Sequence, residues 1–293
     1  MIARRGAGWW FVSPALIAIA VCFAVPVIAA LALSFTDFDI YGIADRHDVR
    51  FVGLDNYRRL FAAPVFWTAL RNTVAFVVVG APLSIAVSLA TALLLHARLA
   101  RARAVFRTAL FAPVVTTVVA VAVIWRYLFH GRYGFLNYVL GWFGIDAIDW
   151  LGDPRWSIPA LIVFAVWKNF GSNMIIFLAG LQSIPDEPYE AARIDGADRV
   201  QQLRFITLPA LAPTMLLVTI LTMVGYFQLF AEPYVMTRGG PAQSTVSVLY
   251  FMFEEGFQWW NLGFASAVAF VLFAIMLAGT LVQLALARRW SQP

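Results

Sequence analysis

Long apolar runs separated by short polar segments dominate the pattern of the chain. A membrane-spanning helix needs about 20 mostly apolar residues, and six runs meet this length. The predicted spans cover residues 9–34, 72–96, 108–130, 158–181, 210–231 and 263–287. The pattern therefore predicts an all-α membrane protein with six transmembrane helices.

The composition points in the same direction. Of the 293 residues, 62% are hydrophobic and 13% are charged, whereas a soluble domain is about half apolar and about a quarter charged. So few charges cannot cover a soluble globule of this size, which argues against a cytosolic enzyme, a disordered segment and a nucleic-acid-binding module. The net charge of +5 is more typical of basic cytoplasmic loops in a membrane chain.

Two rare residue types exclude further kinds of site. Cys22 is the only cysteine, so the chain has neither an internal disulfide nor a cysteine cluster for a metal. Lys168 is the only lysine, and no glycine-rich run precedes it. A P-loop needs its lysine within such a run, so we expect no Walker-type ATP site and no cofactor or metal bound by this chain.

The first apolar run has two interpretations. Arg4 and Arg5 precede it, as basic residues precede the core of a cleaved signal peptide. The run is longer than an ordinary signal-peptide core, and Pro14 and Pro26 lie inside it. A retained first helix is therefore favoured.

The distribution of arginine predicts the direction of insertion, because cytoplasmic loops are enriched in basic residues. With the N-terminus inside, the cytoplasmic segments hold 11 arginines and five acids, and the other side holds nine arginines and 11 acids. The loop between the second and third predicted spans shows the bias best, with Arg98, Arg101, Arg103 and Arg107. Both termini are predicted to be cytoplasmic.

The spans and loops divide the chain into three parts. Residues 1–36 form an N-terminal cytoplasmic tail and the first transmembrane helix. Residues 37–71 mix aromatic residues with arginines and predict an outer segment with interfacial helices. Residues 72–293 form a five-helix core with a polar cytoplasmic loop at 183–209.

One face of the second predicted span is built from small residues at every fourth position, namely Gly80, Ser84, Ser88 and Ala92. Small residues let helix backbones approach closely in lipid. The spacing predicts a packing face, although an alanine-rich chain also produces such a stripe by chance.

The loop at 183–209 predicts a helix, a glycine turn and a second helix. Pro188 suits the first turn of a helix, and Gly196 can take the left-handed conformation that ends it. Residues 198–207 predict a second short helix, and Pro209 begins the next span. Apolar residues flanked by charges on such a loop suit docking into a groove of a partner protein.

The same loop resembles the EAA motif of binding-protein-dependent ABC importer permeases, with the family's spacing throughout. The matching residues are Glu190, Ala191, Ala192, Gly196, Ile206, Leu208 and Pro209. In that family the loop carries the coupling helix, which inserts into a cleft of the ATPase subunit. The resemblance implies a type I ABC importer permease fold. Its implied ATPase-coupling residues are Glu190, Ala191, Ala192, Asp195 and Gly196.

Further segments resemble the carbohydrate branch of this family, the maltose-transporter type. They include FVGLDNY before the second predicted span and TRGGPAQST after the fifth. Gly239, Gly240 and Pro241 form a turn in the latter segment. This turn is either a rigid connector or a surface that faces the binding protein.

The resemblance also implies the other subunits of the transporter. A second homologous permease subunit would complete a heterodimer, and an ABC ATPase dimer would bind ATP and Mg. An extracytoplasmic solute-binding protein would deliver a carbohydrate, which crosses the bacterial inner membrane by alternating access. The chain itself is then a multi-pass, lipid-embedded subunit and not an enzyme, with no nucleic acid as partner.

Polar side chains inside the fourth and fifth predicted spans are the candidates for a substrate pathway. Such groups are costly in lipid and usually point toward the protein interior. The candidates are Asn169, Asn173, Thr222, Tyr226 and Lys168. Hydrogen bonds between helices would explain the same residues, and Lys168 would suit either an acidic partner or an anionic solute.

Three other functions stay open at the level of sequence. A related permease would carry glycerol phosphate or another polyol-like solute. An ion-coupled secondary transporter usually has acids within its spans and internal repeats, and no Asp or Glu lies within the predicted spans. A membrane-embedded enzyme would need clustered catalytic groups, which the spans lack.

Overall fold

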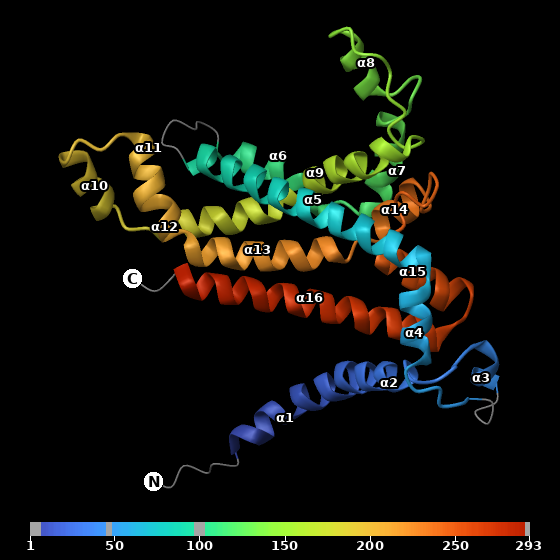
Figure 1. Cartoon of the computed structure of the whole chain (residues 1–293). Helices are drawn as coiled ribbons and strands as arrows, with labels where there is room; N and C mark the ends of the chain where they lie inside the picture. The colour runs from blue at the N-terminus through green and yellow to red at the C-terminus, as the bar shows by residue number, and fades with distance from the viewer. Residues whose placement is uncertain (1–6, 45–48, 97–102, 291–293) are drawn as a thin grey trace. The chain divides into compact units, whose positions relative to one another are not determined.

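The computed structural model describes residues 7–44, 49–96 and 103–290. Helices form nearly all of its regular structure (Figure 1). Within those ranges the only β-pairing is an isolated antiparallel bridge between Thr36 and Phe51. The predicted all-α class is therefore confirmed.

Five helices are long and apolar enough to cross a membrane by themselves. They are Trp9–Leu33, Pro64–His96, Pro154–Gln182, Ala212–Met236 and Leu262–Ala287. A sixth candidate consists of two helices, Ala104–Val115 and Val118–Leu128, which meet at an angle of 99°. Among the described residues, five of the six predicted spans correspond to single helices, and one continuous third span over 108–130 is wrong.

The chain divides into two compact units. The first comprises Met1–Phe66 and Phe251–Ala274, and the second comprises Trp67–Tyr250 and Ile275–Pro293. The orientation predicted from arginine stays a prediction, as does the three-part division of the sequence. Five of its arginines, Arg4, Arg5, Arg46, Arg98 and Arg101, lie outside the described residues.

The first unit contains the N-terminal span and the segment predicted to carry interfacial helices. Its helices are α1 (Ala7–Ile19), a π-helical turn (Ala20–Ala24), α2 (Val25–Leu33), α3 (Ile40–Ala44), α4 (Asp55–Ala62), the end of α15 (Val248–Phe253), a π-helical turn (Glu254–Gln258) and the first half of α16 (Leu262–Trp290). The Asn56 amide fixes α4 by donating to the carbonyls of Ser34 and Thr36, at 2.9 and 2.8 Å.

The second unit holds the remaining helices. They are α5 (Pro64–His96), α6 (Arg103–Val115), α7 (Val118–Leu128), α8 (Phe135–Gly141), α9 (Pro154–Gln182), α10 (Glu187–Ile194), α11 (Arg199–Gln202), a π-helical turn (Leu203–Thr207), α12 (Leu208–Ala210), α13 (Ala212–Phe227), α14 (Ala231–Met236), the first half of α15 and the second half of α16. Helices α10 to α12 lie at one end of α9 and α13, and α7, α8 and α14 lie at the other (Figure 1).

Helix α9 forms the centre of this unit and is its most buried candidate span. Small residues allow its close packing. A Cβ on Gly171 would lie 2.6 Å from the carbonyl oxygen of Leu110 in α6. The predicted small-residue face of α5 is buried throughout, and Ser88 donates from its hydroxyl to the Phe170 carbonyl of α9 at 3.0 Å.

Side chains satisfy the backbone where the third span breaks. Pro113 has no N–H, and the helix ends two residues later. The Thr116 hydroxyl donates to the Pro113 carbonyl at 2.6 Å, and Lys168 Nζ donates to the Val114 carbonyl at 3.1 Å. Irregular backbone at membrane depth needs such internal partners. Hydropathy alone missed the break because the apolar run continues through it.

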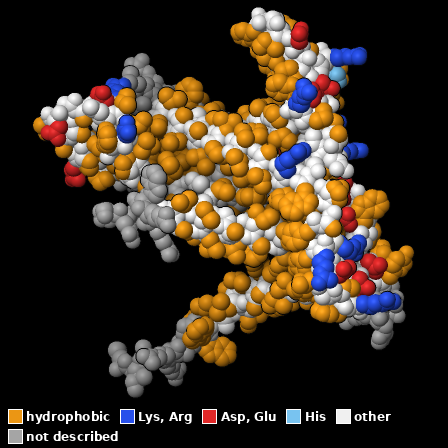
Figure 2. Space-filling view, in the orientation of Figure 1, with side chains coloured by type: hydrophobic (Ala, Val, Ile, Leu, Met, Phe, Trp, Pro, Cys, Tyr) orange, Lys and Arg blue, Asp and Glu red, His pale blue; other side chains and the backbone are white. Residues whose placement is uncertain are grey.

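Hydrophobic side chains cover the long helices on the face shown in Figure 2, and charged side chains gather toward the helix ends. This distribution is the one expected for helices whose middle parts lie in hydrocarbon.

Gly171→Ala should lower the thermal stability of the protein, because the added methyl group meets the backbone of α6. Overpacking of this kind costs about 1–3 kcal/mol. Thermal unfolding of the purified protein in detergent would measure the loss. Gly225→Ala is the matched control, since Gly225 also lies in a membrane helix but no atom lies within 4 Å of its added Cβ. Equal melting temperatures for Gly171→Ala and wild type would contradict the packing described.

Candidate functional site

A cavity of about 600 Å³ lies against α9, α13 and α14 in the second unit. The structure brings all five predicted pathway residues to its wall. They are Lys168, Asn169, Asn173, Thr222 and Tyr226. Further polar groups there are Ser172, Gln228 and Glu232. Apolar side chains with a few polar groups make a wall suited to a small solute.

The two asparagines of α9 share one face but differ in their surroundings. Asn173 is buried, and its amide donates to the Thr222 hydroxyl of α13 at 2.8 Å. Asn169 lies one turn away and is exposed. Asn173 therefore joins two helices, as polar groups in membrane helices often do, while Asn169 keeps its amide accessible.

Tyr226 fills the space between α13 and α5. Its ring lies 5.1 Å from that of Phe76, and Gly80 leaves room for it, because a Cβ there would lie 2.6 Å from Tyr226 Cε1. The buried hydroxyl lies near that of Ser84, yet the two form no hydrogen bond of acceptable geometry. Buried hydroxyls normally have a partner, so Tyr226 holds an unused hydrogen-bonding group beside the cavity.

Lys168 is 8% exposed and has a structural role in this conformation. Its ammonium group donates to the Val114 carbonyl at the break between α6 and α7. The last carbonyls of a helix have no partner within the helix, so a cation there is favourable.

The sequence-based prediction missed Glu232. The predicted fifth span ended at residue 231, whereas the helical span extends to Met236 with a short interruption at Gln228–Phe230. Glu232 lies in the first turn of α14 and lines the same cavity as Lys168. The prediction that no span contains an Asp or Glu is therefore wrong for the fifth span as it is observed.

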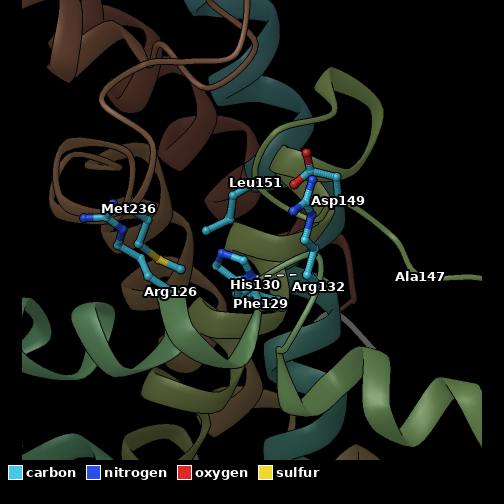
Figure 3. Close-up of a pocket in the computed structure, with 9 residues that line it drawn as sticks. Arg126, Phe129, His130, Arg132, Ala147, Asp149, Leu151 and Met236 are labelled. Carbon is cyan, nitrogen blue, oxygen red and sulfur yellow. Dashed lines mark hydrogen bonds between the residues drawn. The ribbon is translucent and has the colours of Figure 1, made fainter.

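A second cavity, of about 520 Å³, lies at the end of α7 (Figure 3). Its charged and polar lining comes from Arg126, His130, Arg132 and Asp149. The backbone N–H of Arg132 donates to His130 Nδ1 at 3.2 Å. Met236 also lines it, so α14 contributes to both cavities. No sequence motif pointed to this cavity.

The Gly-Gly-Pro turn belongs to a firmly bonded segment. Gly239 is buried with a positive φ of 79°, and the Thr245 hydroxyl donates to the Gly240 carbonyl at 2.8 Å. Pro241 is half-buried, and the exposed part of the segment is its next two residues.

Two residues near the start of α5 hold this segment. The Asn72 amide donates to the carbonyls of Gln243 and Val246, at 2.9 and 3.0 Å. The backbone N–H of Val248 donates to the Thr73 hydroxyl at 3.0 Å. The segment from 243 to 248 is therefore fixed to α5.

The loop with the EAA pattern forms the predicted helix, glycine turn and helix. Gly196 has a φ of 81°, a left-handed conformation that favours glycine. Asp198 then caps α11 in a capping box with Gln201. The Tyr189 hydroxyl is 2.9 Å from that of Thr207, so the two arms of the loop are bonded to each other.

The surface of this loop carries unpartnered apolar groups among charges. Ile194, Val200 and Phe205 are 87%, 71% and 68% exposed. The predicted coupling residues Glu190, Ala191, Asp195 and Gly196 are exposed, and Ala192 is half-buried. A hollow of about 390 Å³ lies between the arms and is lined by Ala192, Asp195 and Gly196, among others.

Comparison with known families decides the identity of the chain. Residues 1–292 match the family described as binding-protein-dependent transport system inner membrane component. The chain belongs to this family. It is therefore a permease subunit of the inner membrane, as the resemblance of the EAA loop predicted.

Individual relatives cover nearly the whole of this permease. The probable ABC transporter permease protein YesP of Bacillus subtilis (strain 168) is 36% identical, over 97% of this chain and 91% of its own. The arabinooligosaccharides transport system permease protein AraP of Halalkalibacterium halodurans is 32% identical, over 93% and 85%. The lactose transport system permease protein LacF of Rhizobium radiobacter is 36% identical, over 96% and 94%.

A solved structure shares the fold of the permease. A chain of the bacterial ABC transporter involved in the import of the acidic polysaccharide alginate superposes with a TM-score of 0.80, at 22% identity, over 98% of both chains. At this identity the likeness concerns the fold, and it confirms the type I ABC importer permease class.

Lys168→Met should destabilise the permease, because the Val114 carbonyl loses its donor at the break of the third span. Leaving a buried polar group unpaired costs about 1–3 kcal/mol, and thermal unfolding in detergent would measure the decrease. Lys168→Arg is the matched control, since it keeps a cationic donor at the position. A Lys168→Met protein as stable as wild type would show that this hydrogen bond does not support the break.

Proposed function

We propose that this permease subunit carries a saccharide across the inner membrane by alternating access, in an ATP-driven importer supplied by an extracytoplasmic binding protein. The observation that carries this proposal is the joint presence of the exposed EAA loop and of a cavity whose wall holds the polar residues of α9 and α13. The loop can receive force at one end of these helices, and the cavity can hold a solute between them.

The relatives support a saccharide as the solute. Two of them are described as transport systems for arabinooligosaccharides and for lactose, each with identity above 30% over most of the chain. Amide and hydroxyl groups at the cavity suit the hydroxyl groups of a sugar. Glycerol phosphate is less favoured, because the cation that would pair with its phosphate donates to a backbone carbonyl instead.

The exposed surface of the EAA loop supports the proposal that the ATPase is a separate subunit. Ile194, Val200 and Phe205 are apolar groups that a partner groove would cover. In this proposal an ABC ATPase dimer binds ATP and Mg, and the loop docks into it with Glu190 and Gly196 at the contact. Both termini and the loop then face the cytoplasm.

A second, homologous permease would complete the pathway as a heterodimer. On the outer side, the binding protein would contact the end of the helices that holds α7, α8 and the Gly239–Pro241 turn. The exposed residues after Pro241 offer the contact there, because Gly239 itself is buried.

Purification of the tagged chain from its native membrane tests this assembly. Co-purification of an ABC ATPase and a second permease, with ATP hydrolysis stimulated by a sugar-loaded binding protein, is the expected result. Sugar uptake by the isolated chain that follows an ion gradient and needs no ATP would instead support a secondary transporter.

Gly196→Trp should uncouple ATP hydrolysis from transport while the chain still inserts. A side chain at φ 81° strains the turn, and a bulky one would also obstruct docking. Transport and substrate-stimulated ATPase activity in proteoliposomes would measure the effect. The amount of Gly196→Trp protein recovered from the membrane is the control for insertion. Normal stimulated ATPase activity in Gly196→Trp complexes would refute the assigned coupling role.

A double variant of Asn173→Ala and Tyr226→Ala should reduce sugar transport by roughly fivefold to 150-fold, because two polar groups of the pathway are removed. Each hydrogen bond contributes roughly 0.5–1.5 kcal/mol, and about 1.4 kcal/mol corresponds to a factor of ten. Initial uptake rates in proteoliposomes would measure it, with ATPase stimulation as a check of assembly. Unchanged uptake would count decisively against this pathway.

A further inference from the structure

Among the described residues, Glu232 is the one anionic side chain on the wall of the cavity along α9, α13 and α14, and Lys168 is the one cationic side chain there. No role is assigned to the glutamate by the family motif or by the sequence pattern. Placing a carboxylate in a membrane span costs free energy, and such a residue is usually functional.

The position of the carboxylate is set by the local fold. The fifth span unwinds at Gln228–Phe230, and α14 restarts with Glu232 in its first turn. Glu232 is thereby placed at the cavity wall, next to Phe230 and Ala231.

The cation in the same wall does not neutralise it directly. Lys168 and Glu232 are near enough for their charges to interact. However, the described residues contain no ion pair between them within 4.0 Å. Lys168 Nζ donates to the Val114 carbonyl instead. Glu232 is half-buried and Lys168 is 8% exposed, and both residues line the cavity.

An ionised carboxylate only accepts hydrogen bonds. A neutral saccharide offers O–H donors to it, while a sugar carrying a carboxylate or phosphate meets a like charge at close range. In a site of low dielectric such repulsion is strong. The wall therefore favours a neutral solute over an anionic one of the same size.

We propose that Glu232 is a specificity-determining residue that accepts hydrogen bonds from a neutral saccharide and excludes anionic sugars from the cavity. This inference rests on the proposed function, because it assumes that saccharides occupy the cavity. A purely structural role at the start of α14 is the alternative, and it predicts no effect on charge selection.

The test uses the purified transporter with its ATPase and second permease, without the binding protein, so that the cavity alone selects. Equilibrium binding is measured for two pairs of probes that differ only in a carboxylate in place of a CH2OH group, lactitol with lactobionate and maltitol with maltobionate. The variant Glu232→Gln keeps the size and the acceptor oxygen but removes the charge. Glu232→Asp keeps the charge, and Glu255→Gln removes an acid that does not line the cavity.

The wild-type transporter should bind the neutral member of each pair more tightly than the anionic member. Glu232→Gln should reduce this preference by about tenfold, which corresponds to about 1.4 kcal/mol of lost repulsion. Glu232→Asp and Glu255→Gln should keep it. Glu232→Ala also removes the charge and should reduce the preference in the same way, which keeps the test available if Glu232→Gln fails to assemble.

The outcomes separate the two proposals. Binding of a neutral sugar with the wild-type preference in Glu232→Gln or in Glu232→Ala would overturn the role of Glu232 alone. Binding of none of the four probes by the wild-type transporter would contradict the saccharide pathway and, with it, the inference that depends on it.

Discussion

Hydrocarbon offers no hydrogen bonds, so every backbone group that leaves a helix within the membrane needs a partner from the protein itself. The second unit depends on this constraint, because two of its spans are interrupted. At the break of the third span, Thr116 and Lys168 supply donors to the carbonyls of Pro113 and Val114. A lysine that would be costly elsewhere in the bilayer is stable there because its charge meets a carbonyl at a helix end.

The second interruption has a different outcome. Where the fifth span unwinds, the chain restarts as α14, and this short helix separates two cavities, with Glu232 in the wall of one and Met236 in the wall of the other. The break therefore places a carboxylate at the side of a polar cavity that continuous helical packing would have filled. Both interruptions lie along α9, whose small residues allow the neighbouring helices to approach it closely.

Hydropathy and spacing predicted much of this architecture, for identifiable reasons. The spans follow from the length of apolar runs, and the EAA loop follows from Gly196 and its fixed distances to Glu190 and Pro209. The polar residues of the fourth and fifth spans were found because such residues are rare in lipid. The break at residue 116 was not predicted, because β-branched threonines within an apolar run do not change hydropathy. Pro113 was the only local signal.

Glu232 shows a second limit of sequence patterns. The predicted fifth span was ended at residue 231 because the next residue, Glu232, is charged. The rule that set this boundary therefore placed Glu232 outside the membrane. Only the three-dimensional path of the chain, which unwinds and then continues to Met236, brings this residue to the cavity. The hydrogen bond from Lys168 to Val114 could not be predicted from local sequence spacing either, because the two residues lie 54 positions apart.

The bonds from Asn72 and Thr73 to the segment at 243–248 have a mechanical consequence. Helix α5 is continuous from Pro64 to His96, and these bonds attach the segment close to its start. A tilt of the first turns of α5 therefore moves the segment with it, and no separate signal has to travel through the cavity.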